Sequence, residues 1–344
     1  MAFDGFPLIM GWEFTLACNL RCEHCGSSAG IPRHNELNTE EALNICDQFP
    51  DLLVQEVDFT GGEPLLRDDL PIIAERLQHH GIRTQVLSNG LILDDEMVNK
   101  LKRSHVSGVG ISLDGPEQLH DCIRSRPGVF QAVVSGIKAL KKAEIPVVVI
   151  TTVNGLNIYE LPNLMNILLS LGVKTWQVQP IFTFGRVKES PRLKLTVDEY
   201  LKLGEFVKIF SPNAREFGLN IMAADSFGYF TDLDERSPKW MGCPAGLVTC
   251  GITSNGRIKG CLSMPDELAK GDLRKRSLWD IWFDPETFAY NRSFFAGALG
   301  PNCNHCDKGE QCKGGCSSMS YGNTGLFHND PYCFYALEKM MSKN

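Results

Sequence analysis

Short β-branched runs alternate with helical stretches from about residue 11 to residue 224 of the chain. This alternation is typical of repeated strand–helix units. The predicted strands span residues 12–16, 54–59, 83–87, 106–113, 146–153 and 174–179. The predicted helices span residues 39–49, 68–79, 94–102, 128–142, 158–171 and 197–210.

Six such units predict an α/β fold with a parallel sheet, because a helical crossover is how parallel strands are joined. Six units are too few for an eight-fold barrel, so we expect a partial (βα)6 TIM-like barrel. In barrels of this kind the chemistry lies at the carboxyl ends of the strands.

Polar or ligating residues follow every predicted strand. In order along the chain, these are Cys18, Cys22 and Cys25; then Gly61, Gly62, Glu63 and Pro64; then Ser88; then Ser112 and Asp114; then Asn154; then Gln179. Any one of these groups also fits a polar turn, which for Ser88 alone is the more common explanation. Their shared placement favours a functional site at this edge of the sheet.

The three cysteines after the first strand lie within eight residues. Thiolates are soft ligands that hold iron–sulfur clusters, and such clusters normally take four cysteines. Three cysteines therefore suggest a four-iron cluster with one iron open. A zinc site or buried free thiols are the alternatives, but the cysteines are too dense for chance burial, and a zinc knuckle needs a nearby fourth ligand.

This spacing resembles the cluster loop of the radical S-adenosylmethionine (SAM) superfamily, with His24 where that family prefers an aromatic residue. The run from Gly61 to Pro64 resembles the motif that binds the methionine amino group of SAM; two glycines let the backbone approach a ligand closely. By the same resemblance Ser112 and Asp114 lie near the ribose and Arg124 reaches the carboxylate, although a surface ion pair is an alternative for Arg124. Ser88 and Asn154 complete the expected SAM contacts.

Eleven of the thirteen cysteines fall in two groups, and the second group follows a polar linker near residue 235. We therefore expect a barrel over residues 1–235 and a small cysteine-rich domain over residues 236–344. Cys46 and Cys122 stand apart, and we interpret both as buried thiols.

The second group resembles the SPASM domain of radical SAM maturases. The resemblance rests on the spacing from Cys303 to Cys316 and on a glycine five residues before Cys261. It implies two auxiliary 4Fe–4S clusters, one held by Cys243, Cys250, Cys261 and Cys316 and the other by Cys303, Cys306, Cys312 and Cys333. Cys250 is the uncertain ligand because its spacing varies, and zinc is the alternative metal.

The net charge of −7 provides no basic stripe for a nucleic acid. The sequence contains no apolar run of eighteen residues and no basic region followed by an apolar one at the start, so we expect neither a membrane span nor a signal peptide. Many cysteines in ligand-like clusters suit a reducing, cytoplasmic compartment.

The resemblance implies reductive cleavage of SAM to a 5′-deoxyadenosyl radical that takes a hydrogen atom from the substrate. Many SPASM relatives modify a ribosomally made precursor peptide by crosslinking, epimerisation or excision. Only about ten residues precede the first strand, so we expect a separate leader-binding protein, and a flavodoxin or ferredoxin as reductant. No catalytic acid or base is identified.

Four alternatives remain. A haem-pathway side-chain oxidase fits the short start of the chain, and peptide splicing fits a catalytic subunit with a partner. A sulfatase-maturase role is disfavoured because Leu262, not an aspartate, follows Cys261. A non-catalytic electron-transfer protein explains the downstream cysteines but gives the run from Gly61 to Pro64 no purpose.

Overall fold

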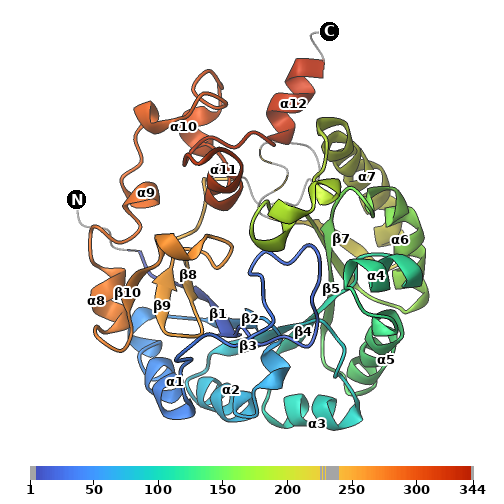
Figure 1. Cartoon of the computed structure of the whole chain (residues 1–344), viewed down its shortest axis with the longest axis vertical. Coiled ribbons are helices and arrows are strands. Elements are labelled where there is room, and N and C mark those ends of the chain that lie inside the picture. Colours follow the sequence, from blue (N-terminus) through green and yellow to red (C-terminus); the bar gives the residue numbers. More distant parts are fainter. Residues whose placement is uncertain (1–4, 225–226, 228, 230–239, 342–344) are drawn as a thin grey trace.

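The computed structural model describes residues 5–224, 227, 229 and 240–341. Its centre is one ten-stranded sheet with the strand order β10-β9-β8-β1-β2-β3-β4-β5-β6-β7 (Figure 1). The strands are β1 (Ile9–Thr15), β2 (Glu56–Gly61), β3 (Arg83–Ser88), β4 (Gly108–Ser112), β5 (Val147–Val153), β6 (Thr175–Pro180), β7 (Asn220–Ala223), β8 (Thr249–Ile252), β9 (Arg257–Lys259) and β10 (Lys270–Asp272).

All six predicted strands are present and pair in parallel, which confirms the α/β class and the open, partial barrel. The structure contains two further parallel strands that the sequence pattern did not predict. β7 pairs with β6, and β8 pairs with the other side of β1. Both have only four residues, too few for a recognisable alternating pattern, and the β7 side chains are buried only at Ile221.

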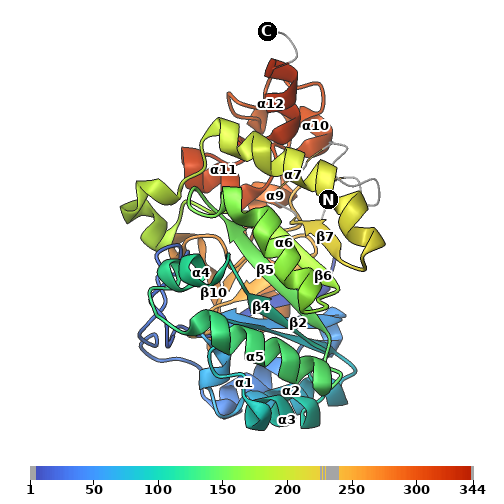
Figure 2. The same ribbon diagram turned by 90° about the vertical axis from the view of Figure 1, so that its right-hand side faces the viewer.

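The helices of the first two thirds cover the outer face of this sheet (Figures 1 and 2). They are α1 (Thr39–Cys46), α2 (Leu70–His79), α3 (Asp95–Arg103), α4 (Glu117–Ile123), α5 (Val129–Lys142), α6 (Leu161–Ser170) and α7 (Val197–Glu216). The prediction missed α4, whose seven residues are too short for a clear helical period. It also ended α7 too early, because that helix continues past Pro212.

Aromatic side chains fix the first two strands against each other beneath the carboxyl edge. The ring of Phe14 lies 4.8 Å from that of Phe59 and 5.7 Å from that of Trp12, and all three side chains are buried. Rigid aromatic contacts of this kind dominate core energetics. They place the segment that follows β1 in a defined position.

The C-terminal part consists of short elements around a small core. Its helices are α8 (Leu278–Trp282), α9 (Ala289–Arg292), α10 (Gly309–Cys312), α11 (Ser317–Thr324) and α12 (Phe334–Met341). The expected domain boundary at residue 235 lies outside the described residues and stays a prediction; the sheet itself extends across it through the pairing of β8 with β1. None of the described helices is long and apolar enough to cross a membrane.

Candidate iron–sulfur and SAM site

The loop after β1 carries the first three cysteines and closes on itself. The amide of Cys18 donates to the carbonyl of Gly30 at 3.3 Å, and the amide of Gly30 donates to the carbonyl of Leu16 at 3.0 Å. Cys22 is buried, whereas Cys18 and Cys25 are half-buried. A closed loop of this kind holds its side chains at the carboxyl end of the strand, where chemistry is expected.

Arg186 fixes the inner wall of this loop. It lies in the 3₁₀ helix η4 (Gly185–Glu189), just beyond β6. Its guanidinium donates to the carbonyls of Cys22 at 2.8 Å and Ala29 at 2.9 Å, and its own amide donates to the carbonyl of Cys25 at 3.1 Å. The sequence analysis missed Arg186, because nothing in its local sequence signals a contact more than 150 residues away.

Each of the three thiols accepts one N–H group. Asn89 Nδ2 lies 3.8 Å from Cys18 Sγ, Arg124 Nη1 lies 3.8 Å from Cys22 Sγ, and the Ala29 amide lies 3.4 Å from Cys25 Sγ. Burial raises the pKa of the Cys18 and Cys22 thiols. Hydrogen bonds to sulfur favour the thiolate form and are one way in which a protein sets the potential of a bound cluster. This donor set fits a thiolate-ligated cluster.

The two glycines after β2 permit close contact with the cluster loop. Gly61 has φ +122°, and a Cβ at Gly62 would lie 2.0 Å from the carbonyl oxygen of Ala17. The amide of Gly62 donates to the carbonyl of Thr15 at 2.7 Å, and the amide of Glu63 donates to that of Ala17 at 2.8 Å. The two glycines therefore allow the end of β2 to pack directly against the cluster loop.

The Glu63 carboxylate is fully buried and accepts hydrogen bonds from residues at the end of β3. It accepts hydrogen bonds from Ser88 Oγ at 2.9 Å, from the Asn89 amide at 2.8 Å and from the Leu65 amide at 3.3 Å. Burial outweighs these bonds and raises the pKa of Glu63 to about 7. Pro64 starts the short 3₁₀ helix η2 (Pro64–Leu66) that supports this arrangement.

Asp114 and Arg124 form a buried ion pair behind Cys22. Arg124 Nε and Nη2 both lie 2.7 Å from Asp114 Oδ2, and the two side chains are 8% and 0% exposed. The alternative of a surface ion pair for Arg124 is therefore wrong: α4 places the guanidinium inside. Burial alone would raise the pKa of Asp114, but the Arg124 charge and two neighbouring histidines outweigh it and lower that pKa.

Two buried histidines complete this cluster. His24 Nε2 lies 3.7 Å from Asp114 Oδ2, and His120 Nδ1 accepts the Asp114 amide at 3.0 Å. Burial lowers the pKa of each imidazole to about 4, so both are neutral at pH 7. His24 thus lies against the site from the position where the family prefers an aromatic ring.

Ser112 and Asn154 end β4 and β5 at the same edge. Ser112 is half-buried. The buried Asn154 amide is used locally: its Oδ1 accepts the Leu156 amide at 3.0 Å and its Nδ2 donates to the Thr152 carbonyl at 3.1 Å. Its side chain therefore shapes the turn after β5.

The C-terminal cysteines form two groups. The Cys243 and Cys316 thiols lie within electrostatic range of each other, and their interaction lowers the pKa of Cys243 and raises that of Cys316. Burial, followed by the nearby Cys243 charge, raises the pKa of Cys261, which places Cys261 in the same group.

The outer group consists of Cys303, Cys306, Cys312 and Cys333. Burial raises the pKa of Cys312 and of Cys333 to about 12, and charges on other members of the group add to the effect in both cases. Cys312 therefore lies within electrostatic range of each of the other three.

Cys250 stands apart from the Cys243 group. It is buried in β8 opposite Met10 of β1, and none of the other cysteines contributes to the raised pKa of its thiol, which burial brings to about 12. Tyr290 lies within electrostatic range of both Cys250 and the Cys243 group. Whether Cys250 is a ligand stays a prediction.

The two isolated cysteines differ. Cys46 is buried as expected, but Cys122 is exposed, because α4 turns His120 and Ile123 inward instead. Over the part of the chain that the structure describes, no three His, Cys, Asp or Glu side chains are arranged to hold a single metal ion.

The parallel strands end at one edge of an open sheet, where three cysteine thiols lie beside a buried glutamate and a buried ion pair. This combination is typical of an iron–sulfur protein built on a partial barrel. Residues 12–168 match the Radical SAM superfamily, and residues 243–307 match SPASM, an iron–sulfur cluster-binding domain. The chain therefore carries a radical SAM domain followed by a SPASM domain. The expected cofactors, SAM with a 4Fe–4S cluster and auxiliary iron–sulfur clusters, are thereby confirmed.

Relatives with different names resemble the chain to a similar degree. It is 28% identical to the AdoMet-dependent heme synthase of Methanosarcina barkeri, over 97% of this chain and 98% of that protein. It is 29% identical to the mycofactocin maturase MftC of Mycobacterium tuberculosis, over 95% and 83%. The structure of Streptococcus suis SuiB bound to S-adenosylmethionine matches with a TM-score of 0.76 at 20% identity, covering 96% of this chain and 77% of that one, which supports the fold.

Proposed function

We propose that this enzyme cleaves SAM reductively at a cluster held by Cys18, Cys22 and Cys25, and that it modifies a ribosomally made precursor peptide. When bound and reduced, the cluster supplies the electron that splits SAM into methionine and a 5′-deoxyadenosyl radical, which takes a hydrogen atom from the substrate. The single observation that carries this proposal is the closed loop with three hydrogen-bonded thiols, which leaves one iron for SAM.

The surrounding residues bind and orient. The backbone from Gly61 to Glu63 is proposed to receive the methionine amino group, and Ser112 and Asp114 the ribose. Arg124 is already held by Asp114, so its remaining N–H groups are the ones proposed to reach a carboxylate. Glu63, Ser88 and Asn154 act by fixing the strand ends, because their polar atoms are used within the protein.

The auxiliary clusters are proposed to sit in the two cysteine groups of the SPASM domain. Cys243, Cys261 and Cys316, with Cys250 as the uncertain fourth ligand, would hold the inner cluster. Cys303, Cys306, Cys312 and Cys333 would hold the outer one. Their role would be to accept or relay an electron, or to hold the substrate.

The peptide substrate is supported by the similarity to the mycofactocin maturase, whose name denotes a maturase. A separate leader-binding protein and a flavodoxin or ferredoxin reductant belong to the same proposal. Cysteines free of disulfides throughout the described residues suit a cytoplasmic location. Binding of the precursor peptide by the isolated enzyme would argue against the separate leader-binding protein.

A haem-pathway role is the second candidate. It is favoured by the relatives named AdoMet-dependent heme synthase, one of which aligns over 98% of its length. In both candidates the same radical would take a hydrogen atom, but from a different substrate. Incubation with each substrate in turn therefore distinguishes the two functions.

The test is an anaerobic incubation of the cluster-loaded enzyme with SAM and dithionite in two arms. One arm contains iron coproporphyrin III, and the other contains candidate precursor peptides encoded beside the gene. We expect a peptide to change in mass and to raise 5′-deoxyadenosine formation above the rate without substrate. The same effects with the porphyrinoid alone would favour the second candidate, and an absence of deoxyadenosine in all arms would contradict both.

A further inference from the structure

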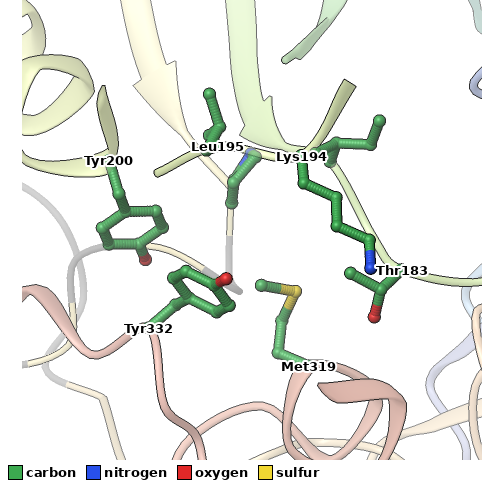
Figure 3. A pocket seen from close by; sticks show the side chains of 8 residues that line it. Thr183, Lys194, Leu195, Tyr200, Met319 and Tyr332 are labelled. Atoms are coloured by element: carbon green, nitrogen blue, oxygen red, sulfur yellow. The ribbon is translucent and has the colours of Figure 1, made fainter. Parts of the chain in front are cut away.

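A small pocket lies where the barrel meets the SPASM domain (Figure 3). Pro180, the last residue of β6, lines it on the barrel side, and Met319 of α11 lines it on the SPASM side. Met319 is three residues after Cys316, and Tyr332, which also lines the pocket, directly precedes Cys333. The pocket therefore lies between the carboxyl edge of the sheet and both auxiliary cysteine groups.

The polar groups of this pocket are three hydroxyls and one positive charge. The Thr183 hydroxyl already donates to Asn323 Oδ1 at 3.1 Å. Lys194 and the hydroxyls of Tyr200 and Tyr332 are therefore the donors available to a ligand. Figure 3 shows the side chains of Lys194 and Thr183 on one side of Met319 and the hydroxyl of Tyr332 on the other. Lys194 is exposed, and its ammonium makes no hydrogen bond or ion pair to another described residue. None of the described residues that line the pocket is acidic, so its charge favours an anion.

Tyr200 provides an independent sign that a ligand is missing. Its side chain is 1% exposed and lines the pocket, yet its hydroxyl has no hydrogen-bond partner among the described residues. Its ring lies 5.6 Å from that of Tyr332, and its hydroxyl end points toward that ring (Figure 3). Buried hydroxyls are nearly always paired, and an unpaired one requires an explanation.

The rest of the wall is apolar, with Ile181, Leu195 and Met319 as its main contributors. One ammonium matches the single charge of a carboxylate, whereas a phosphate group carries about −1.5 to −2. An apolar stem would pack on the aliphatic side chains while its carboxylate meets Lys194 and the two tyrosine hydroxyls.

We propose that this pocket binds a carboxylate of the substrate that is carried on an apolar stem. The inference rests on the proposed function, since it places part of the substrate at the mouth of the barrel. A peptide would supply the carboxylate from its terminus or an acidic side chain, and a porphyrinoid would supply it from a propionate. The shared chemistry is the carboxylate, and the experiment distinguishes the two sources.

The test measures binding by anaerobic calorimetry with the cluster-loaded full chain. The probes are N-acetylphenylalanine against its amide, and iron coproporphyrin III against its tetramethyl ester. We expect at least one free acid to bind at least tenfold more tightly than its neutral partner. Lys194→Met should abolish that difference, whereas Lys188→Met, which removes an exposed lysine outside the pocket, should preserve it.

Tyr200→Phe provides a second variant. It should weaken binding of the acid severalfold and leave the neutral probe unaffected, whereas a hydroxyl with only a packing role would leave both unaffected. Lys194-dependent binding of N-acetylphenylalanine assigns the carboxylate to a peptide, and that of the porphyrinoid assigns it to a propionate. If neither acid is preferred, or if the preference survives Lys194→Met, the proposal is overturned.

The proposed function is tested separately in the same preparation, by deoxyadenosine formation in the unaltered enzyme. SAM cleavage with no Lys194-dependent preference removes the subsite and leaves the proposed function standing. A Lys194-dependent preference for the acid without SAM cleavage would support the subsite and contradict the proposed function.

Discussion

Arg124→Met is expected to destabilise the barrel strongly by leaving Asp114 charged and buried. The guanidinium donates one hydrogen bond of 2.7 Å from Nε and makes a second ion-pair contact of 2.7 Å from Nη2, both to a carboxylate whose exposure is 0%. Removing one partner of such a pair typically costs about 3–5 kcal/mol, because the remaining charge is uncompensated. Removing both charges costs much less.

The double variant Asp114→Asn with Arg124→Met therefore tests the reasoning. It should be more stable than Arg124→Met alone, although it carries one more substitution. The matched control is Arg192→Met, which breaks a pair with Glu23 whose arginine side chain is 58% exposed. We expect that control to lose far less stability than Arg124→Met, because solvent screens an exposed pair.

Urea unfolding under anaerobic conditions, followed by the fluorescence of the buried Trp12 and Trp176, measures these differences. Additive losses in the double variant, or an equal loss in Arg192→Met and Arg124→Met, would refute the account of the buried pair.

Three further changes probe the site. Burial raises the pKa of Glu63 from 4.5 to about 7, so the folded state holds that proton more tightly. The unfolding free energy should therefore fall as pH rises across that window. Burial also raises the pKa of Asp58 to about 7 and that of Asp330 to about 6, so a pH series on Glu63→Gln should show a smaller fall than the unaltered enzyme, and an equal fall would contradict the role of Glu63. Gly62→Ala would place a Cβ 2.0 Å from a backbone oxygen of the cluster loop, so the iron content per chain should fall. The control is Gly26→Ala, which has open space around it and should bind the normal amount of iron. Asn89→Ala removes the N–H group that faces Cys18 Sγ at 3.8 Å, and should lower the reduction potential of the cluster in an EPR-monitored titration; an unchanged potential would count against the hydrogen bond.

The local sequence predicted the parts of the fold that rest on long, regular patterns. All six strands formed as expected, since their β-branched runs are buried between helical crossovers. The strands β7 and β8 could not be predicted, because each is too short to show an alternation of apolar and polar residues. Each is positioned by pairing with a longer neighbouring strand, β6 or β1.

Some residues of the site could likewise be predicted from local sequence, and others could not. Cysteine spacing and the Gly61–Gly62 pair are local signals, and the structure brings them together. Arg186 could not be predicted, because it acts through three carbonyl contacts to a loop far away in sequence. The exposure of Cys122 was missed because it depends on the rotation of α4, a helix too short to show a period.

Iron and sulfide content with electron paramagnetic resonance, measured on anaerobically purified protein, tests the central claim most directly. The comparison is with a variant in which Cys18, Cys22 and Cys25 are alanine. The account predicts about twelve irons per chain falling to about eight, from three four-iron clusters to two, with loss of deoxyadenosine formation. Zinc in place of iron, or SAM cleavage that survives in the variant, would contradict it.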